Sequence, residues 1–321
     1  MSHLKATPLP IAFLLTSFAF LACNGGGGEG DATPVETPAP TPTSAQAATV
    51  TPTVVLLDDY LVVTLRFEAA LARISADFGE ALPESEEDVV QTKQAVAELE
   101  SALSPLVEEA VETLAEVAPP PEAEAYHGAL VNAFGDLESF AGDVAAALEP
   151  GTVIVLSPVV SDFTDLTIEL GEVALEGQLL VTSALGAAGD DLVSTYLLAA
   201  TERRVEMSRT LAEPSEELDR LLGSGDTSGA LAVLEQLIAS LEDLGDRWQQ
   251  LSPPPEARDL HQRQGELIDE AVAVERLIHT AVRDQDQSVL AEAAEKSKET
   301  SILRDRLEAD WNELLIEVLS R

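Results

Sequence analysis

The sequence predicts an all-α protein of eight helices, built either as two four-helix bundles in tandem or as one merged eight-helix body. Three observations predict this class. Apolar residues recur at spacings of three and four, strand-like alternation is almost absent, and a ten-residue segment occurs twice. The hydrophobic content of 45% can build a sizeable core, and 24% of charged residues is ordinary for a folded chain.

Residues 1–22 are expected to be an export signal rather than part of the fold. Lys5 gives a basic start, and the apolar run from Ile11 to Leu21 is too short to span a bilayer as a mature helix. The lone cysteine of the chain, Cys23, follows in the context Phe20-Leu21-Ala22-Cys23. This segment resembles the lipobox of bacterial lipoproteins, which implies a lipid on the Cys23 thiol and cleavage just before it. An ordinary secretory signal that leaves Cys23 as a free thiol is the alternative.

Residues 23–53 are predicted to form a lipidated tether. From Asn24 to Thr53 the chain is rich in Gly, Pro, Thr and other small residues and has almost nothing to bury. The resemblance implies an exported protein that is anchored to the outer face of a bacterial membrane by Cys23. A stable anchor of this kind needs two or more acyl chains.

The folded part is predicted to be a tandem duplication, with units at residues 54–189 and 190–321. Residues 118–127 read APPPEAEAYH and residues 252–261 read SPPPEARDLH, which are identical at six of ten positions. The offset of 134 residues persists downstream, where Val173 pairs with Leu307 and Leu180 with Leu314. Upstream, Tyr60 corresponds to Tyr196 if a two-residue indel is allowed.

Each unit is expected to contain four helices. In the second unit a helix capped by Asp226 carries the clearest apolar ladder: Leu234, Leu237, Leu241, Leu244, Trp248 and Leu251. The triple proline of each repeat should end one helix and start the next, since proline is tolerated in a first helical turn. The last helix is expected from about Ser288 to Leu319, and residues 152–160 (TVIVLSPVV) are expected to be an irregular connection.

The charge of −40 argues against nucleic acid as a partner, because phosphate binding needs a cationic surface. The bias is uneven, with 26 acidic and 3 basic residues at 58–189 but 29 and 14 at 190–321. Acidic runs such as 84–88 are interpreted as solvated helix starts, with a cation-binding or docking face as the alternative. The arginines from Arg203 and Arg204 to Arg209 could complement the acidic first unit, within the molecule or between copies.

His127 and His261 are the candidate metal ligands, since they occupy equivalent positions in the repeat. Neither has an acidic residue three or four positions later, as a metal-binding helix pair usually has. The favoured interpretation is structural, with each imidazole bonded to a carbonyl of the Pro-rich turn; metal or haem ligation is the alternative.

No other segment predicts a catalytic or metal site. Residues 284–295 follow calcium-loop spacing, but Val289 stands where that loop requires glycine, so helix capping by Asp284 or Asp286 is preferred. Motifs for nucleophilic hydrolases, phosphate loops, dinucleotide folds and zinc proteases are absent from the sequence. We therefore expect no enzyme and no cofactor beyond the covalent lipid at Cys23.

The expected function is a non-catalytic, membrane-tethered extracytoplasmic module that binds a protein or envelope component or acts as a spacer. An exposed apolar patch would support it. The alternative is a cation- or solute-binding lipoprotein that uses acidic clusters and His127 or His261, which requires these groups to converge in one cavity. The sequence leaves the protein or cell-wall partner and the oligomeric state unknown.

Overall fold

A computed structural model describes residues 53–83, 89–148, 156–188 and 192–321, and it confirms the all-α class. Cys23, the predicted export signal and all of the predicted tether before residue 53 lie outside these residues, as do the acidic run 84–88 and residues 152–155. The described residues contain eight long helices: α2 (Leu57–Ala81), α3 (Val89–Glu116), α4 (Glu124–Ala147), α5 (Leu156–Ala188), α6 (Leu192–Ser224), α7 (Thr227–Gln249), α8 (Arg258–Asp284) and α9 (Gln287–Leu319).

The helix ends follow the local signals in the sequence. The Asp226 side chain accepts a hydrogen bond from the Gly229 backbone N–H at 3.0 Å, which confirms the predicted cap of α7. Both PPPE segments form a single 3-10 turn, η1 (Pro121–Ala123) and η2 (Pro255–Ala257), that leads directly into the next helix. The last helix begins within one residue of its predicted start.

The prediction of an irregular connection at residues 152–160 is wrong for residues 156–160, because α5 begins at Leu156. Pro158 therefore lies in the first turn of this helix, where a backbone N–H would have no partner within the helix in any case. The β-branched residues there suggested a break, but helix propensity is a weak signal beside tertiary packing.

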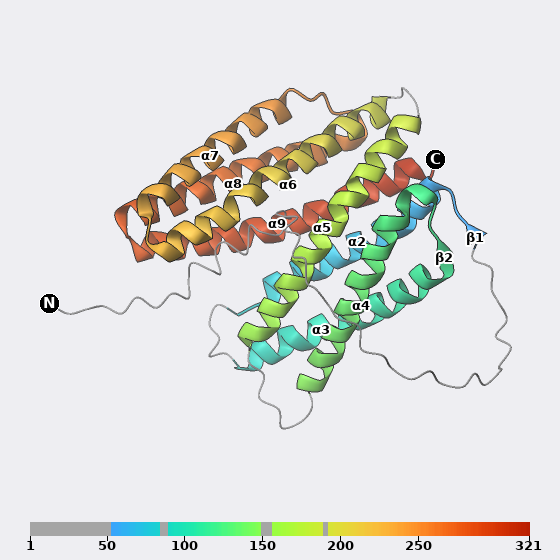
Figure 1. Cartoon of the computed structure of the whole chain (residues 1–321), viewed down its shortest axis with the longest axis horizontal. Coiled ribbons are helices and arrows are strands. Elements are labelled where there is room, and N and C mark those ends of the chain that lie inside the picture. The colour runs from blue at the N-terminus through green and yellow to red at the C-terminus, as the bar shows by residue number, and fades with distance from the viewer. Residues whose placement is uncertain (1–52, 84–88, 149–155, 189–191) are drawn as a thin grey trace, which may run out of the picture.

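A short pair of strands was not expected from the sequence. Strand β1 (Thr53–Val54) runs parallel to β2 (Val117–Ala118), with Thr53 opposite Val117 and Val54 opposite Ala118. The pairing brings the start of the described chain to the end of α3, next to the first Pro-rich turn (Figure 1).

The helices pack as one merged body rather than as two separate bundles. The most extensive helix pair joins the first helix to the last: α2 and α9 run antiparallel, with ion pairs between Arg73 and Glu313 and between Glu80 and Arg306. A single apolar core contains side chains from both halves, from Tyr60 to Leu315. A second, smaller cluster lies where α6, α7, α8 and α9 pack together away from it.

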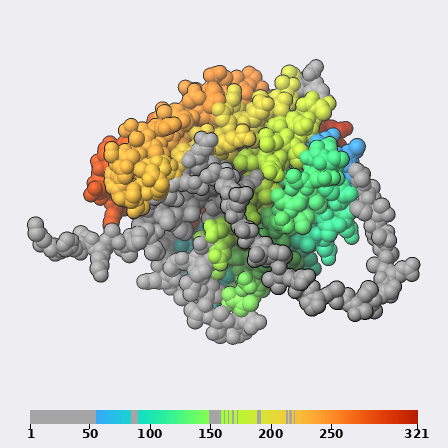
Figure 2. All heavy atoms as spheres, in the orientation of Figure 1, coloured from blue at the N-terminus to red at the C-terminus, as the bar shows by residue number. Residues whose placement is uncertain are grey.

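Helix α5 connects the two halves of this body. It packs against α4 and against α6, and it also contacts α2. In the space-filling view the yellow-green atoms of α5 lie between the green atoms of α4 and the yellow and orange atoms of α6 and α7 (Figure 2). Among the residues that the structure describes, no helix combines the length and the apolar character that a bilayer crossing requires.

Candidate functional site

A cavity of about 110 Å³ lies where the first and last helices of the two halves meet. Its lining comes from α2, α4, α5, α6 and α9. The apolar part of the lining consists of Leu71, Ala72, Phe134, Leu170, Gly171, Ala174 and Leu175, and the polar part of Glu68, Ser75, Thr167, Gln178, Ser208, Arg304, Asp305, Glu308 and Asn312. A concave, mainly apolar site with a few convergent polar groups is the usual form of a small-molecule site.

Small side chains on two helices leave the room for this cavity. Ala72 on α2 and Gly171 and Ala174 on α5 all belong to its lining. A cavity in a well-packed core lowers the free energy of unfolding, because its lining loses dispersion and hydrophobic contacts. Larger residues at these positions would therefore stabilise the fold if the cavity did not have to accommodate a ligand.

Glu68 is the carboxyl that α2 contributes to the cavity. Its Oε1 accepts a hydrogen bond from the Tyr126 hydroxyl at 2.5 Å. Burial, and next the negative charge of Glu308, raise the pKa of Glu68 to about 7, although the Tyr126 hydrogen bond and the nearby Arg204 act in the opposite direction. Near neutral pH this carboxyl therefore exists in both protonation states.

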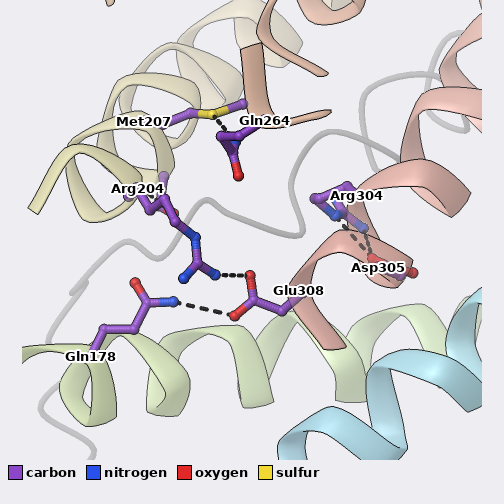
Figure 3. A network of polar contacts seen from close by, with 8 residues as sticks. Gln178, Arg204, Met207, Gln264, Arg304, Asp305 and Glu308 are labelled. Atoms are coloured by element: carbon purple, nitrogen blue, oxygen red, sulfur yellow. Dashed lines mark hydrogen bonds and ion pairs between the residues drawn. The ribbon is translucent and has the colours of Figure 1, made fainter. Parts of the chain in front are cut away.

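Opposite Glu68, an ion pair joins α6 to α9. The Arg204 guanidinium donates to Glu308, and the Gln178 amide of α5 donates to the other Glu308 oxygen at 3.5 Å (Figure 3). Arg204 is 6% exposed and lies over the Trp311 ring, with 5.2 Å from its guanidinium carbon to the ring centroid. The face of the Trp311 ring thus attracts the Arg204 guanidinium, which the surrounding residues shield from water.

A second set of polar contacts fixes the α9 side of the cavity. Asp305 accepts from Ser75 of α2 at 2.7 Å, and both Arg304 nitrogens Nε and Nη2 donate to its other oxygen (Figure 3). The Arg304 and Asp305 side chains are both largely buried, so the charge of each compensates the charge of the other.

Two polar atoms of the lining have no hydrogen-bond partner within the described structure. They are the carbonyl oxygen of the Gln178 side chain and the amide nitrogen of the Asn312 side chain, and both residues are more than nine-tenths buried. A buried polar atom without a partner destabilises the fold by about 1 to 3 kcal/mol. One acceptor and one donor are therefore left for whatever occupies the cavity.

The two candidate ligand histidines, His127 and His261, lie in separate corners and not in this cavity. Nδ1 of His127 lies 3.2 Å from the Tyr60 hydroxyl, and Nδ1 of His261 lies 3.0 Å from the Tyr196 hydroxyl. The partner of each ring is thus a tyrosine of the unit's first helix, where we had expected a carbonyl of the Pro-rich turn. Burial lowers the pKa of both imidazoles below its usual value.

Groups of three or more metal-ligating side chains were not found within the described ranges. In the segment with calcium-loop spacing, Asp286 caps α9 through the Ser288 backbone N–H at 2.9 Å, which confirms the capping interpretation. Asp284 instead pairs with Arg283 at 2.8 Å. Both aspartates of this segment are therefore used in local contacts.

The ion pairs of Arg203 and Arg204 lie within the second half, although the charge of Arg204 also lowers the pKa of Glu68 in the first half. Arg204 pairs with Glu308 and Arg203 with Glu206 at 2.9 Å, and both acids belong to residues 190–321. The reason is geometric, since α6 turns this face toward the C-terminal half of α9.

The sequence analysis missed Glu68, Gln178 and Asn312, but a signal for Glu68 was present. Leu61, Leu65, Glu68 and Leu71 follow helical spacing, so a carboxyl interrupts the apolar stripe of α2. A charged residue on the buried face of a helix needs a partner or a function. Its partner Tyr126 lies on another helix and could not be read from spacing.

Comparison of the chain with protein-family models, with curated proteins and with solved structures finds no match. The geometry of the cavity therefore carries the functional argument.

Proposed function

We propose that the protein is a non-catalytic, membrane-tethered extracytoplasmic module that binds a small solute in the central cavity. The supporting observation is that two deeply buried side chains of the lining each carry a polar atom without a partner among the described residues: the Gln178 carbonyl oxygen and the Asn312 amide nitrogen. Unpaired buried polar groups are costly, and a bound solute that pairs with them removes the cost.

Export and tethering rest on the sequence of residues 1–53. The Leu21-Ala22-Cys23 context and the Gly/Pro/Thr-rich segment after it support an anchor at Cys23. In this proposal the lipid holds the protein at the outer face of the membrane, and the tether lets the helical body sample solute nearby. The tandem duplication belongs to the same proposal, supported by the two similar Tyr–His corners.

A protein-binding or spacer function has less support from the surface. The large apolar side chains that are well exposed in the described residues come one from each of five separate segments: Leu56, Val90, Val131, Leu179 and Leu192. Single exposed apolar residues are ordinary on soluble domains, whereas interaction sites expose contiguous patches.

Filling the cavity tests the proposal. We would follow thermal unfolding of the full chain with a panel of cationic, neutral and anionic organic solutes of about six to eight non-hydrogen atoms, the size class for which such a cavity has room. We expect at least one member to raise the midpoint by several degrees. The shift should disappear in Ala174→Leu, which places a larger side chain in the cavity.

The matched control is Ala187→Leu, because Ala187 lies on the exposed face of the same helix. It should respond to the solute like the unmodified protein. A panel without any stabilising member, or a shift that persists in Ala174→Leu, would contradict solute binding in this cavity.

A further inference from the structure

The charges around the cavity are not balanced. Three carboxyl side chains line it, Glu68, Asp305 and Glu308. Asp305 is paired with Arg304, and Glu308 with Arg204. In the described structure the hydrogen-bond partner of Glu68 is a neutral hydroxyl, that of Tyr126. The site thus contains one carboxylate, that of Glu68, that forms no ion pair in the described structure.

An unpaired acceptor belongs to the same lining. The Gln178 carbonyl oxygen has no donor among the described residues, while the amide nitrogen of this side chain is already directed to Glu308. A second carbonyl or carboxylate oxygen is what an ammonium group with three N–H donors needs in addition to its counter-ion. A ligand anion would instead find one unpaired donor in the lining, at Asn312, and would face three carboxyl groups.

We propose that the cavity binds a small organic monocation, with its ammonium group between Glu68 and the Gln178 carbonyl and its apolar body against Leu71, Phe134 and Leu170. This inference rests on the proposed solute-binding function and names the class of solute. The unpaired Asn312 N–H is available to a hydroxyl or carbonyl oxygen elsewhere on the ligand. The overall charge of −40 increases the local concentration of any cation at low salt.

The electrostatics of Glu68 agree with this assignment. The groups that face it are the neutral Tyr126 hydroxyl from α4 and two charged side chains, Glu308 from α9 and Arg204 from α6, and their combined effect with burial is a pKa of about 7. A bound ammonium group would favour the ionised carboxylate and lower this pKa again. Binding of the cation should therefore release a proton near neutral pH and weaken in acid.

The test compares three probes of nearly equal size on the full chain by titration calorimetry: n-pentylammonium, 1-pentanol and pentanoate. At pH 8 we expect n-pentylammonium to bind about tenfold or more tightly than 1-pentanol, and pentanoate more weakly than both. Between pH 8 and pH 5.5 the affinity for n-pentylammonium should fall about tenfold or more as Glu68 takes up a proton, while that for 1-pentanol stays unchanged.

Glu68→Gln tests the assigned residue. It should remove the preference for the cation and its pH dependence, and it should keep the affinity for 1-pentanol. Asp77→Asn is the matched control, because Asp77 is an exposed acid on the same helix; this variant should keep the preference. If Glu68→Gln does not fold, the ratio of the affinities for n-pentylammonium and 1-pentanol in the unmodified protein, and its pH dependence, still test the proposal.

The possible failures are distinguishable. Equal affinities for n-pentylammonium and 1-pentanol, tighter binding of pentanoate, or an unchanged preference in Glu68→Gln would overturn the cation assignment and leave solute binding standing. No heat of binding with any of the three probes would overturn the cation assignment as well. The wider panel and Ala174→Leu then decide separately whether the cavity takes a solute of another class.

Discussion

The two Pro-rich corners of the molecule share one contact and differ in what surrounds it. In the first, Tyr60 meets Nδ1 of His127 at 3.2 Å; in the second, Tyr196 meets Nδ1 of His261 at 3.0 Å. The ring centroids lie 5.9 and 6.0 Å apart in the two pairs. The corner itself is thus a common building unit of both halves.

The aromatic residues that fill the space beside the corners come from different helices. In the first half Tyr126 of α4 lies so close to Gly177 of α5 that a Cβ there would meet its hydroxyl at 2.7 Å. The predicted repeat pairs Tyr126 with Leu260 and Gly177 with Trp311. The first half thus has a tyrosine on α4 against a glycine on α5, whereas the predicted equivalents in the second half are a leucine on α8 and a tryptophan on α9.

The two halves also differ in the polar group that lies beside these aromatic residues. Tyr126 donates to Glu68 in the first half, whereas Trp311 supports Arg204 in the second. The predicted correspondence of Tyr60 with Tyr196 also pairs Glu68 with Arg204. At positions that the predicted repeat makes equivalent, the two halves therefore carry opposite charges, and Glu68 but not Arg204 belongs to the lining of the cavity.

Converting one half to the other should have the largest effect. We expect Tyr126→Leu to lower the free energy of unfolding by about 2 to 4 kcal/mol, because it leaves a void and removes the donor to Glu68. Gly177→Trp alone should lower the free energy of unfolding by a similar amount, because its side chain would overlap the space that Tyr126 fills. Combined, the two changes should recover about 1 to 3 kcal/mol in a double-mutant cycle measured by urea unfolding.

Gly186→Ala gives the control for this pair. Gly186 lies on the same helix, and a Cβ at this position would have no atom within 4 Å, so alanine there should gain up to about 1 kcal/mol through helix propensity. Additive effects of Tyr126→Leu and Gly177→Trp would mean that the two residues do not share one space.

Glu275 offers the next largest effect, because it stands where the repeat places Ala141 in the first half. It is 3% exposed, one of its oxygens is unpaired, and burial raises its pKa to about 7. A carboxyl whose pKa is raised by folding destabilises the protein as pH rises from about 4.5 to about 7.

We expect Glu275→Met to raise the free energy of unfolding by on the order of 3 kcal/mol at pH 8 and far less at pH 4. Glu275→Gln should likewise flatten the pH dependence, with a smaller gain because a buried amide still needs partners. A stability difference between Glu275→Met and the unmodified protein that is equal at both pH values would contradict the raised pKa.

The smallest effects test whether the corners are equivalent. Tyr60→Phe and Tyr196→Phe each remove one hydrogen bond to a histidine and should each cost about 1 kcal/mol. His261→Ala should cost more than His127→Ala, since the His261 ring also stacks on Trp248 at a centroid distance of 5.0 Å. Equal melting temperatures for the two histidine variants would show that this stack contributes nothing.

The elements that were predicted correctly depend on residues close in the chain. The Asp226 cap involves Gly229, three positions later, and the PPPE turns and the apolar ladder of α7 are equally local. The exchange of Tyr126 against Trp311 and the pairing of α2 with α9 depend on contacts between distant segments. The apolar periodicity of one helix does not show against which other helix its apolar stripe will pack.

The candidate site follows the same rule. Glu68 could have been found as a charge on an apolar stripe, but its neighbours come from α4, α5 and α9. The histidines attracted attention because they are rare, and the structure places each with a tyrosine instead of with metal-ligating side chains. Rarity of a residue type is thus a poorer guide to this site than a charge on a buried face.

The antiparallel pairing of α2 with α9 has a consequence for how the chain folds. Arg73 and Glu313, which pair across it, are separated by 240 positions in sequence. The ribosome makes α2 well before α9, the helix with which α2 packs most extensively. Closing such a long loop slows folding, so the face of α2 that packs on α9 stays uncovered until α9 has been made.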